Sequence, residues 1–206
     1  MRQCLGLVVL FVATIGAFGA QAEPAVDEAV RETLETYIAA MRDGEYEKMA
    51  GLMHPEDLKQ FKKLYLLIAI EAEEADAFDE LRFFLGGIRS AKDLEATTPE
   101  KFFATFMSAL IQVAPDLGAI LKTAKVTLLG QVTEGGDDEL LHVVHRMEME
   151  MEMEMEVEGE PISTLDVTSM RKTAEGDYRL ILDEMAWGVT RSLQKRFGIK
   201  EGIELD

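Results

Sequence analysis

This 206-residue chain has one cysteine, and its basic side chains are few relative to its acidic ones. The one cysteine, Cys4, comes before an apolar run near the N-terminus, so the body of the chain has no disulfide and no thiolate metal site. Lys and Arg number 21 against 39 Asp and Glu, which gives a formal net charge of −18. Because phosphate backbones and anionic lipids attract clustered cations, this balance argues against nucleic acid or an anionic membrane surface as partner.

Motifs of the common enzyme classes are also missing from the sequence. The chain has no glycine-rich phosphate loop, no Gly-x-Ser-x-Gly elbow and no His-Glu-x-x-His pair, and it contains only three histidines. We therefore predict no cofactor and no metal, and the sequence leans against an enzyme. It names neither a ligand nor a reaction.

The N-terminal segment has the pattern of a targeting signal. Arg2 supplies a positive charge, an apolar run extends over residues 5–18, and Ala20 to Ala22 form a small-x-small cleavage pattern. We expect residues 1–22 to be a signal peptide and the protein to be exported, to the periplasm or the extracellular space. The remainder, residues 23–206, is expected to form a single domain.

Apolar residues make up 48% of the chain, and in its first half they recur at helical spacing. The pattern predicts a helix from Val26 to Arg42, with Gly44 as a left-handed cap. His54 comes before Pro55, a favoured first helical residue, and is most simply a helix cap. Further helices are expected over 45–52, 55–85, from a capping box of Thr97 and Glu100 onward, and over 117–121 beyond a break at Pro115.

After Ala124 the hydrophobic period changes to two, which is typical of strands. Four strands are expected, over 126–133, 140–158, 162–172 and 178–185, followed by a short basic helix over 190–197. Short turns between them predict an antiparallel meander. The chain is therefore expected to be α+β, with N-terminal helices packed on a curved four-stranded antiparallel sheet. A straight strand over 140–158 would span about 60 Å, so this strand must curl, bulge or project.

The segment from Tyr37 to Met49 resembles the first helix, glycine-containing turn and second helix of the nuclear transport factor 2-like (cystatin-like) superfamily. The order of elements resembles this family over nearly all of residues 23–206, although the helical material between His54 and Leu121 is longer than in a minimal member. The resemblance implies a cone-shaped α+β domain and a homodimer formed through the sheet. It does not imply one activity, since the family includes isomerases, dehydratases, cyclases and noncatalytic members.

Residues Met147 to Glu158 alternate strictly between an apolar residue, mostly Met, and Glu. On a strand this alternation gives one apolar and one acidic face, whereas on a helix it leaves no apolar stripe. Four interpretations stay open. They are Cu(I) chelation by the thioethers, loose Ca²⁺ binding by the carboxylates, an adaptable pocket lined by the methionines, and ordinary core with a solvated face. The last is favoured.

His145 is the one histidine expected on the apolar face of its strand. With Asp183 on a late strand it forms the weak candidate for an acid–base pair. His142 has the opposite parity and is expected to be exposed. The candidate ligand-binding residues, chosen because aromatic, thioether and imidazole groups suit a cavity wall, are Tyr37, His145, Met147, Met149, Met151, Tyr178 and Trp187.

Three functions are consistent with these patterns. The first is a noncatalytic exported domain that binds a small apolar ligand or a protein partner, with a homodimer through the sheet as one form of it. The second is a small pocket enzyme of the isomerase or dehydratase type, using His145 and Asp183. The third is a structural envelope protein. An enclosed apolar cavity favours the first, and an open pocket with the two side chains in hydrogen-bond contact favours the second.

Overall fold

The computed structural model describes residues 26–134, 140–149, 162–182 and 184–199. The expected signal peptide, Met151 with the rest of the Met–Glu run beyond Met149, and Asp183 lie outside these residues. In the part of the chain that is described, no helix combines the length and the apolar character needed to cross a membrane.

The protein is α+β, as predicted, with helices first and an antiparallel sheet after them. The helices are α1 (Glu28–Asp43), α2 (Tyr46–Ala50), α3 (Pro55–Glu74), the 3-10 helix η1 (Phe78–Glu80), α4 (Arg82–Leu85), α5 (Ala91–Ala96), α6 (Pro99–Val113), α7 (Pro115–Thr123) and α8 (Glu184–Arg196). The strands are β1 (Lys125–Glu134), β2 (Leu140–Met149), β3 (Ile162–Lys172) and β4 (Tyr178–Leu180).

Local sequence signals set several of these boundaries. Asp27 caps α1 by accepting the backbone N–H of Ala29, and Gly44 ends the helix with a φ of 73°. This left-handed conformation costs a side-chain-bearing residue about 1–2 kcal/mol, which explains the glycine. Pro55 begins α3, with His54 as its backbone cap, and Pro115 separates α6 from α7. The predicted roles of Gly44, His54, Pro55 and Pro115 are confirmed, whereas the Asp27 cap was not predicted.

Two helix predictions need correction. The hydroxyl that caps α6 belongs to Thr98, which accepts the N–H of Lys101 at 3.3 Å. The Thr97 hydroxyl donates instead to the backbone carbonyl oxygen of Asp93, in the first turn of α5, a helix that the sequence pattern did not indicate. In addition, the helix expected over 55–85 ends at Glu74, and short helical segments follow it.

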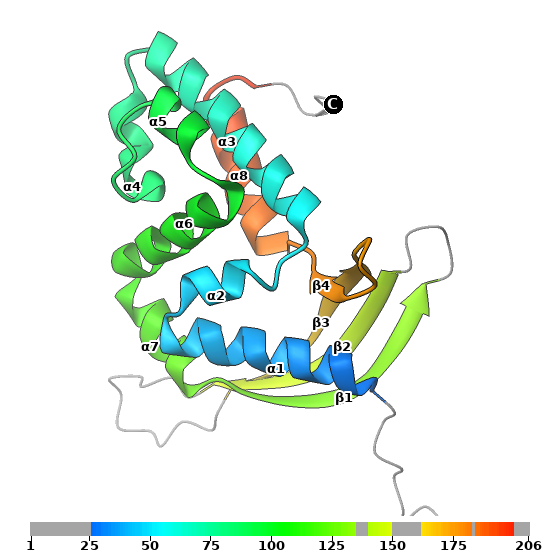
Figure 1. Ribbon diagram of the computed structural model, residues 1–206. Helices are drawn as coiled ribbons and strands as arrows, with labels where there is room; N and C mark the ends of the chain where they lie inside the picture. The colour runs from blue at the N-terminus through cyan, green and yellow to red at the C-terminus, as the bar shows by residue number, and fades with distance from the viewer. Residues whose placement is uncertain (1–25, 135–139, 150–161, 183, 200–206) are drawn as a thin grey trace, which may run out of the picture.

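The four strands form one sheet in the order β1-β2-β3-β4, each antiparallel to its neighbour. The register places His145 of β2 opposite Leu128 of β1 and Asp166 of β3. A bulge between Leu128 and Gly130 interrupts the β1–β2 ladder, and such bulges bend a strand. β1 and β2 curve alongside α1 (Figure 1).

The fourth strand is shorter than its alternating pattern predicts. β4 ends at Leu180, where the chain leaves the sheet, and α8 begins at Glu184, so Trp187 lies on a helix. Two backbone hydrogen bonds join Leu180 to the segment before α3: the Leu180 N–H donates to Leu52 O, and the His54 N–H donates to Leu180 O. These bonds direct the segment after β4 toward the helices.

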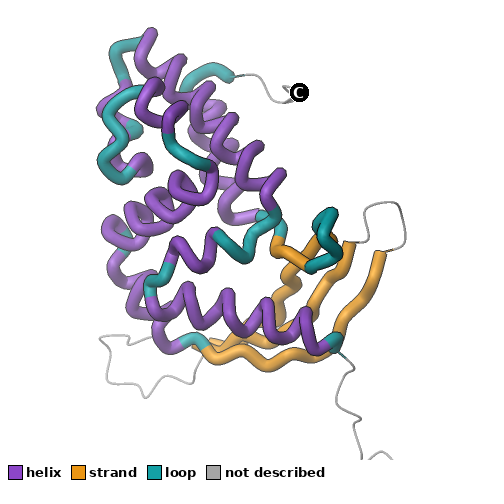
Figure 2. Tube along the Cα trace, viewed as in Figure 1, coloured by secondary structure: helices purple, strands orange, loops and turns teal. Residues whose placement is uncertain are grey.

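Helices and strands occupy separate regions (Figure 2), with α1 and α7 in contact with the sheet and α3 to α6 and α8 extending away from it. An aromatic cluster fills the helical region. The ring of Phe61 on α3 lies 4.8 Å from that of Tyr65 and 5.2 Å from that of Phe106 on α6. Buried aromatic pairs contribute about 0.5–1.5 kcal/mol each beyond the burial of their area. Trp187 packs edge-on against Phe61, with centroids 6.2 Å apart.

Candidate binding cavity

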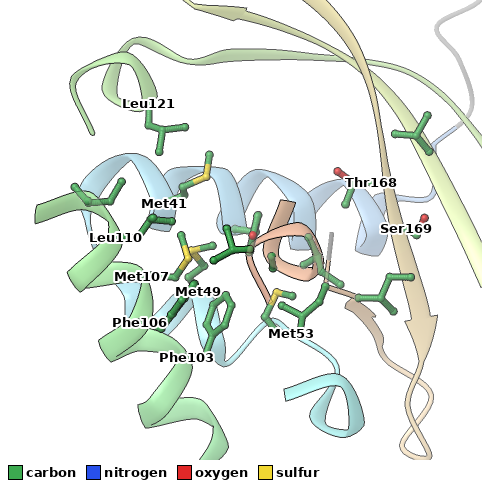
Figure 3. Close-up of a pocket in the computed structure, with 18 residues that line it drawn as sticks. Met41, Met49, Met53, Phe103, Phe106, Met107, Leu110, Leu121, Thr168 and Ser169 are labelled. Atoms are coloured by element: carbon green, nitrogen blue, oxygen red, sulfur yellow. The ribbon is translucent and has the colours of Figure 1, made fainter. Parts of the chain in front are cut away.

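A partly enclosed cavity of about 310 Å³ lies where the helices meet the sheet. Its wall comes from α1, the segment around α2, α6, α7, β3, the connection after β4, and α8. Four methionines contribute to it: Met41 of α1, Met49 of α2, Met53 beyond α2, and Met107 of α6. Figure 3 shows these side chains gathered beside Phe103 and Phe106. Because thioether side chains are flexible, such a wall adapts to ligands of different shapes.

Helical periodicity places the α6 and α1 side chains on the cavity wall. Phe103, Phe106, Met107 and Leu110 follow one another at spacings of three, one and three residues, so they share one side of α6. Tyr37 lines the cavity one helical turn before Met41. Phe103 and Phe106 also contact the Phe61 ring, so these two side chains belong both to the cavity wall and to the aromatic cluster.

The cavity exists because β4 is short. β4 pairs with β3 only from Met170 to Lys172, and one further bond joins Ile181 N–H to Ser169 O. Beyond this point the chain turns into α8, and the exposed edge of β3 at Val167 to Ser169 becomes part of the wall. Thr168 and Ser169 lie at this end, away from Leu110 and Leu121 (Figure 3).

Other hollows are larger but differ in chemistry, and two of them, the largest described, show this. One, of about 580 Å³, lies between η1 and α8 and includes Glu80, Lys195 and Arg196. The other, of about 560 Å³, lies over the C-terminal end of α1 and includes Arg42, Asp43 and Lys122. Charged side chains at their walls are typical of open solvated surface, whereas ligand sites are mostly apolar and concave. The methionine-lined cavity is therefore the candidate site.

His145 is buried behind the polar end of the cavity, as its strand parity predicts. Its exposed fraction is 1%, and its Nε2 lies 2.9 Å from the Thr168 hydroxyl oxygen. Burial lowers the pKa of His145, and the Asp166 carboxylate opposes this with a smaller upward effect. At neutral pH the imidazole is therefore uncharged.

The other predicted site residues lie apart from the cavity or outside the described residues. Met147 and Met149 lie on β2 and do not line it. Tyr178 of β4 instead lies under the Lys172 ammonium group, 5.9 Å from its ring centroid. Trp187 packs into the aromatic cluster. Tyr37 is the predicted ligand-binding residue that lines the cavity.

The outward face of the sheet carries polar and apolar side chains together. His142, expected to be exposed, is partly covered, because its Nδ1 lies 2.8 Å from Ser169 Oγ and its Nε2 lies 3.1 Å from Glu134. Leu165 and Val132 on this face are 69% and 61% exposed. The homodimer through the sheet would cover them and stays a prediction.

Sequence reasoning missed most of the cavity wall. The four cavity methionines are spread over residues 41 to 107, and no local pattern joins them. The sequence contains a weak signal of the cavity, namely Met and Phe residues at inward helical positions. Ordinary core packing explains these positions equally well.

Comparisons with known proteins add no identification. No protein-family model, no curated protein and no solved structure matches this chain. The resemblance to the nuclear transport factor 2-like superfamily is thus untested by these comparisons.

Proposed function

We propose that this protein binds a small, largely apolar molecule in the methionine-lined cavity and does not transform it. The observation that carries the proposal is the cavity itself: about 310 Å³, partly enclosed, with a wall of Met, Phe, Leu and Ile side chains and few polar groups. Small-molecule sites are typically 300–1,000 Å³ and have this composition. The expected signal peptide supports a role outside the cytoplasm.

The alternative, acid–base catalysis by His145 and Asp183, has less support. A general acid or base must come within hydrogen-bond distance of its substrate. His145 is 1% exposed and is not part of the cavity wall, with Thr168 between the imidazole and the cavity. An imidazole in this position is better placed to orient a neighbouring side chain than to contact a substrate in the cavity.

Binding of a neutral fluorescent probe tests the proposal. Phenylnaphthylamine is apolar and emits strongly only when it leaves water. We expect saturable, one-site enhancement of its emission and a rise in the melting temperature with probe concentration, since a ligand that binds only the folded state stabilises it. Linear, unsaturable fluorescence with an unchanged melting temperature would contradict the proposal.

A further inference from the structure

Thr168 and His145 form a hydrogen-bonding pair at the polar end of the cavity. Thr168 lines the cavity, and its Oγ1 lies 2.9 Å from Nε2 of His145. The second ring nitrogen of His145, Nδ1, is buried and has no hydrogen-bond partner among the described residues. The imidazole therefore makes a single hydrogen bond within that part of the chain, and this bond points toward the cavity wall.

The orphaned Nδ1 indicates which tautomer is present. A proton on Nδ1 would bury an N–H donor without an acceptor, which proteins tolerate less readily than an acceptor without a donor. A proton on Nε2 leaves only a lone pair unmatched and lets Nε2–H donate to the Thr168 hydroxyl oxygen. The lowered pKa of His145 agrees with a neutral ring. His145 is thus the donor, and Thr168 Oγ1 is the acceptor.

Because Thr168 Oγ1 accepts the hydrogen bond from His145, the Thr168 hydroxyl hydrogen is available for a second hydrogen bond. A threonine hydroxyl has one donor besides its acceptor lone pairs, and no described residue accepts a hydrogen bond from Thr168. The neighbouring Ser169 hydroxyl is engaged with His142 Nδ1 at 2.8 Å, on the outward face of the sheet. Of these two hydroxyls, Thr168 is the one that can donate into the cavity.

We propose, as a deepening of the binding function above, that the ligand is an apolar molecule with one accepting oxygen, of the ketone or ester class, bound by the Thr168 hydroxyl. The apolar body occupies the methionine-lined part of the cavity, and the carbonyl oxygen lies at the β3 end. A ligand that offers donors alone leaves the Thr168 hydroxyl hydrogen without an acceptor, whereas a carbonyl oxygen accepts it. His145 acts as a positioning residue, since its Nε2–H fixes which way the hydroxyl points.

A matched ligand pair tests the carbonyl contact. Methyl heptyl ketone is compared with the alkene in which a methylene group replaces the carbonyl oxygen, each by displacement of phenylnaphthylamine. For Thr168→Val we expect ketone affinity to fall about fivefold and alkene affinity to change less than about twofold, because one neutral hydrogen bond is lost. Thr168→Ser keeps the hydroxyl and should retain the ketone affinity. His145→Phe should lower ketone affinity alone, and His145→Gln, which supplies an amide donor, should restore part of it.

Two further variants keep the test decisive. Should Thr168→Val unfold because His145 loses its acceptor, the double variant His145→Phe with Thr168→Val removes both polar partners and should still lose ketone affinity selectively. Thr164→Val makes the same exchange at an exposed threonine of β3 that does not line the cavity, and it should leave ketone affinity unchanged. Equal losses for ketone and alkene, or a selective loss of ketone affinity in Thr164→Val instead, would overturn the proposal. If wild-type protein binds neither ligand nor the probe, the binding function itself fails.

Discussion

Asp57 Oδ1 lies 3.6 Å from Arg171 Nη1, and this ion pair joins the first turn of α3 to the end of β3. The second carboxylate oxygen of Asp57 accepts the backbone N–H of Leu182 at 3.3 Å. Leu182 lines the cavity in the connection between β4 and α8. One carboxylate therefore ties the helical region, the sheet and one cavity wall together.

Replacing this carboxylate should destabilise the protein. Asp57→Ala leaves Arg171 and the Leu182 N–H without their partner, so we expect the free energy of unfolding to fall by about 2 kcal/mol. Urea denaturation measures the change. Glu56→Ala is the control, because Glu56 is in the same helical turn but forms its ion pair with Lys59 at the exposed surface. A loss in Glu56→Ala as large as that in Asp57→Ala would contradict the assigned role.

Gly86 and Gly44 both have the left-handed backbone, but their surroundings differ. A Cβ at Gly86 would come within 2.5 Å of Thr105 Cγ2 and 3.0 Å of Thr105 O, whereas at Gly44 the nearest atom is 3.9 Å away. We expect Gly44→Ala to cost about 1–2 kcal/mol of stability from the backbone alone. Gly86→Ala should cost clearly more, because it also moves α4 away from α6. Equal melting temperatures for the two variants would show that no such contact exists.

Stability should depend on pH through His145. Burial lowers the pKa of His145 in the folded protein, so over the interval just below the ordinary histidine value the unfolded chain binds more protons. Stability is therefore expected to fall as pH decreases through about 6.5. His145→Gln, which cannot titrate, should lose part of this dependence, and Asp166→Asn should steepen it by removing the opposing carboxylate. The free energy of unfolding is measured across this pH interval for both proteins. Identical slopes of this free energy against pH in wild type and His145→Gln would refute the burial of a neutral imidazole.

Much of the fold could be predicted because its signals are local. Gly44, Pro55 and Pro115 each impose a backbone restriction on their own neighbours, and the change of hydrophobic period after Ala124 marks the start of the sheet. His145 was also assigned to the correct face, because strand parity determines which side a residue occupies.

The end of β4 and the cavity could not be predicted, since both depend on contacts between distant segments. The alternation over 178–185 reads as a strand, but bonds from Leu180 to Leu52 and His54 draw the chain out of the sheet. The Met–Glu run is a regular pattern in the sequence, yet Met147 and Met149 do not line the cavity. The methionines that line it come from α1, α6 and the segment around α2. Sequence spacing has no information about which residues meet across α1, α6 and β3.

Blocking the cavity is the most direct test of the binding function. Met107→Trp places a bulky ring on the cavity wall, whereas Met147→Trp makes the same exchange on β2 away from the wall. With both variants folded by circular dichroism, phenylnaphthylamine titration should give at least about tenfold weaker binding for Met107→Trp, equivalent to about 1.4 kcal/mol, and wild-type affinity for Met147→Trp. Undiminished probe binding in Met107→Trp would contradict the account.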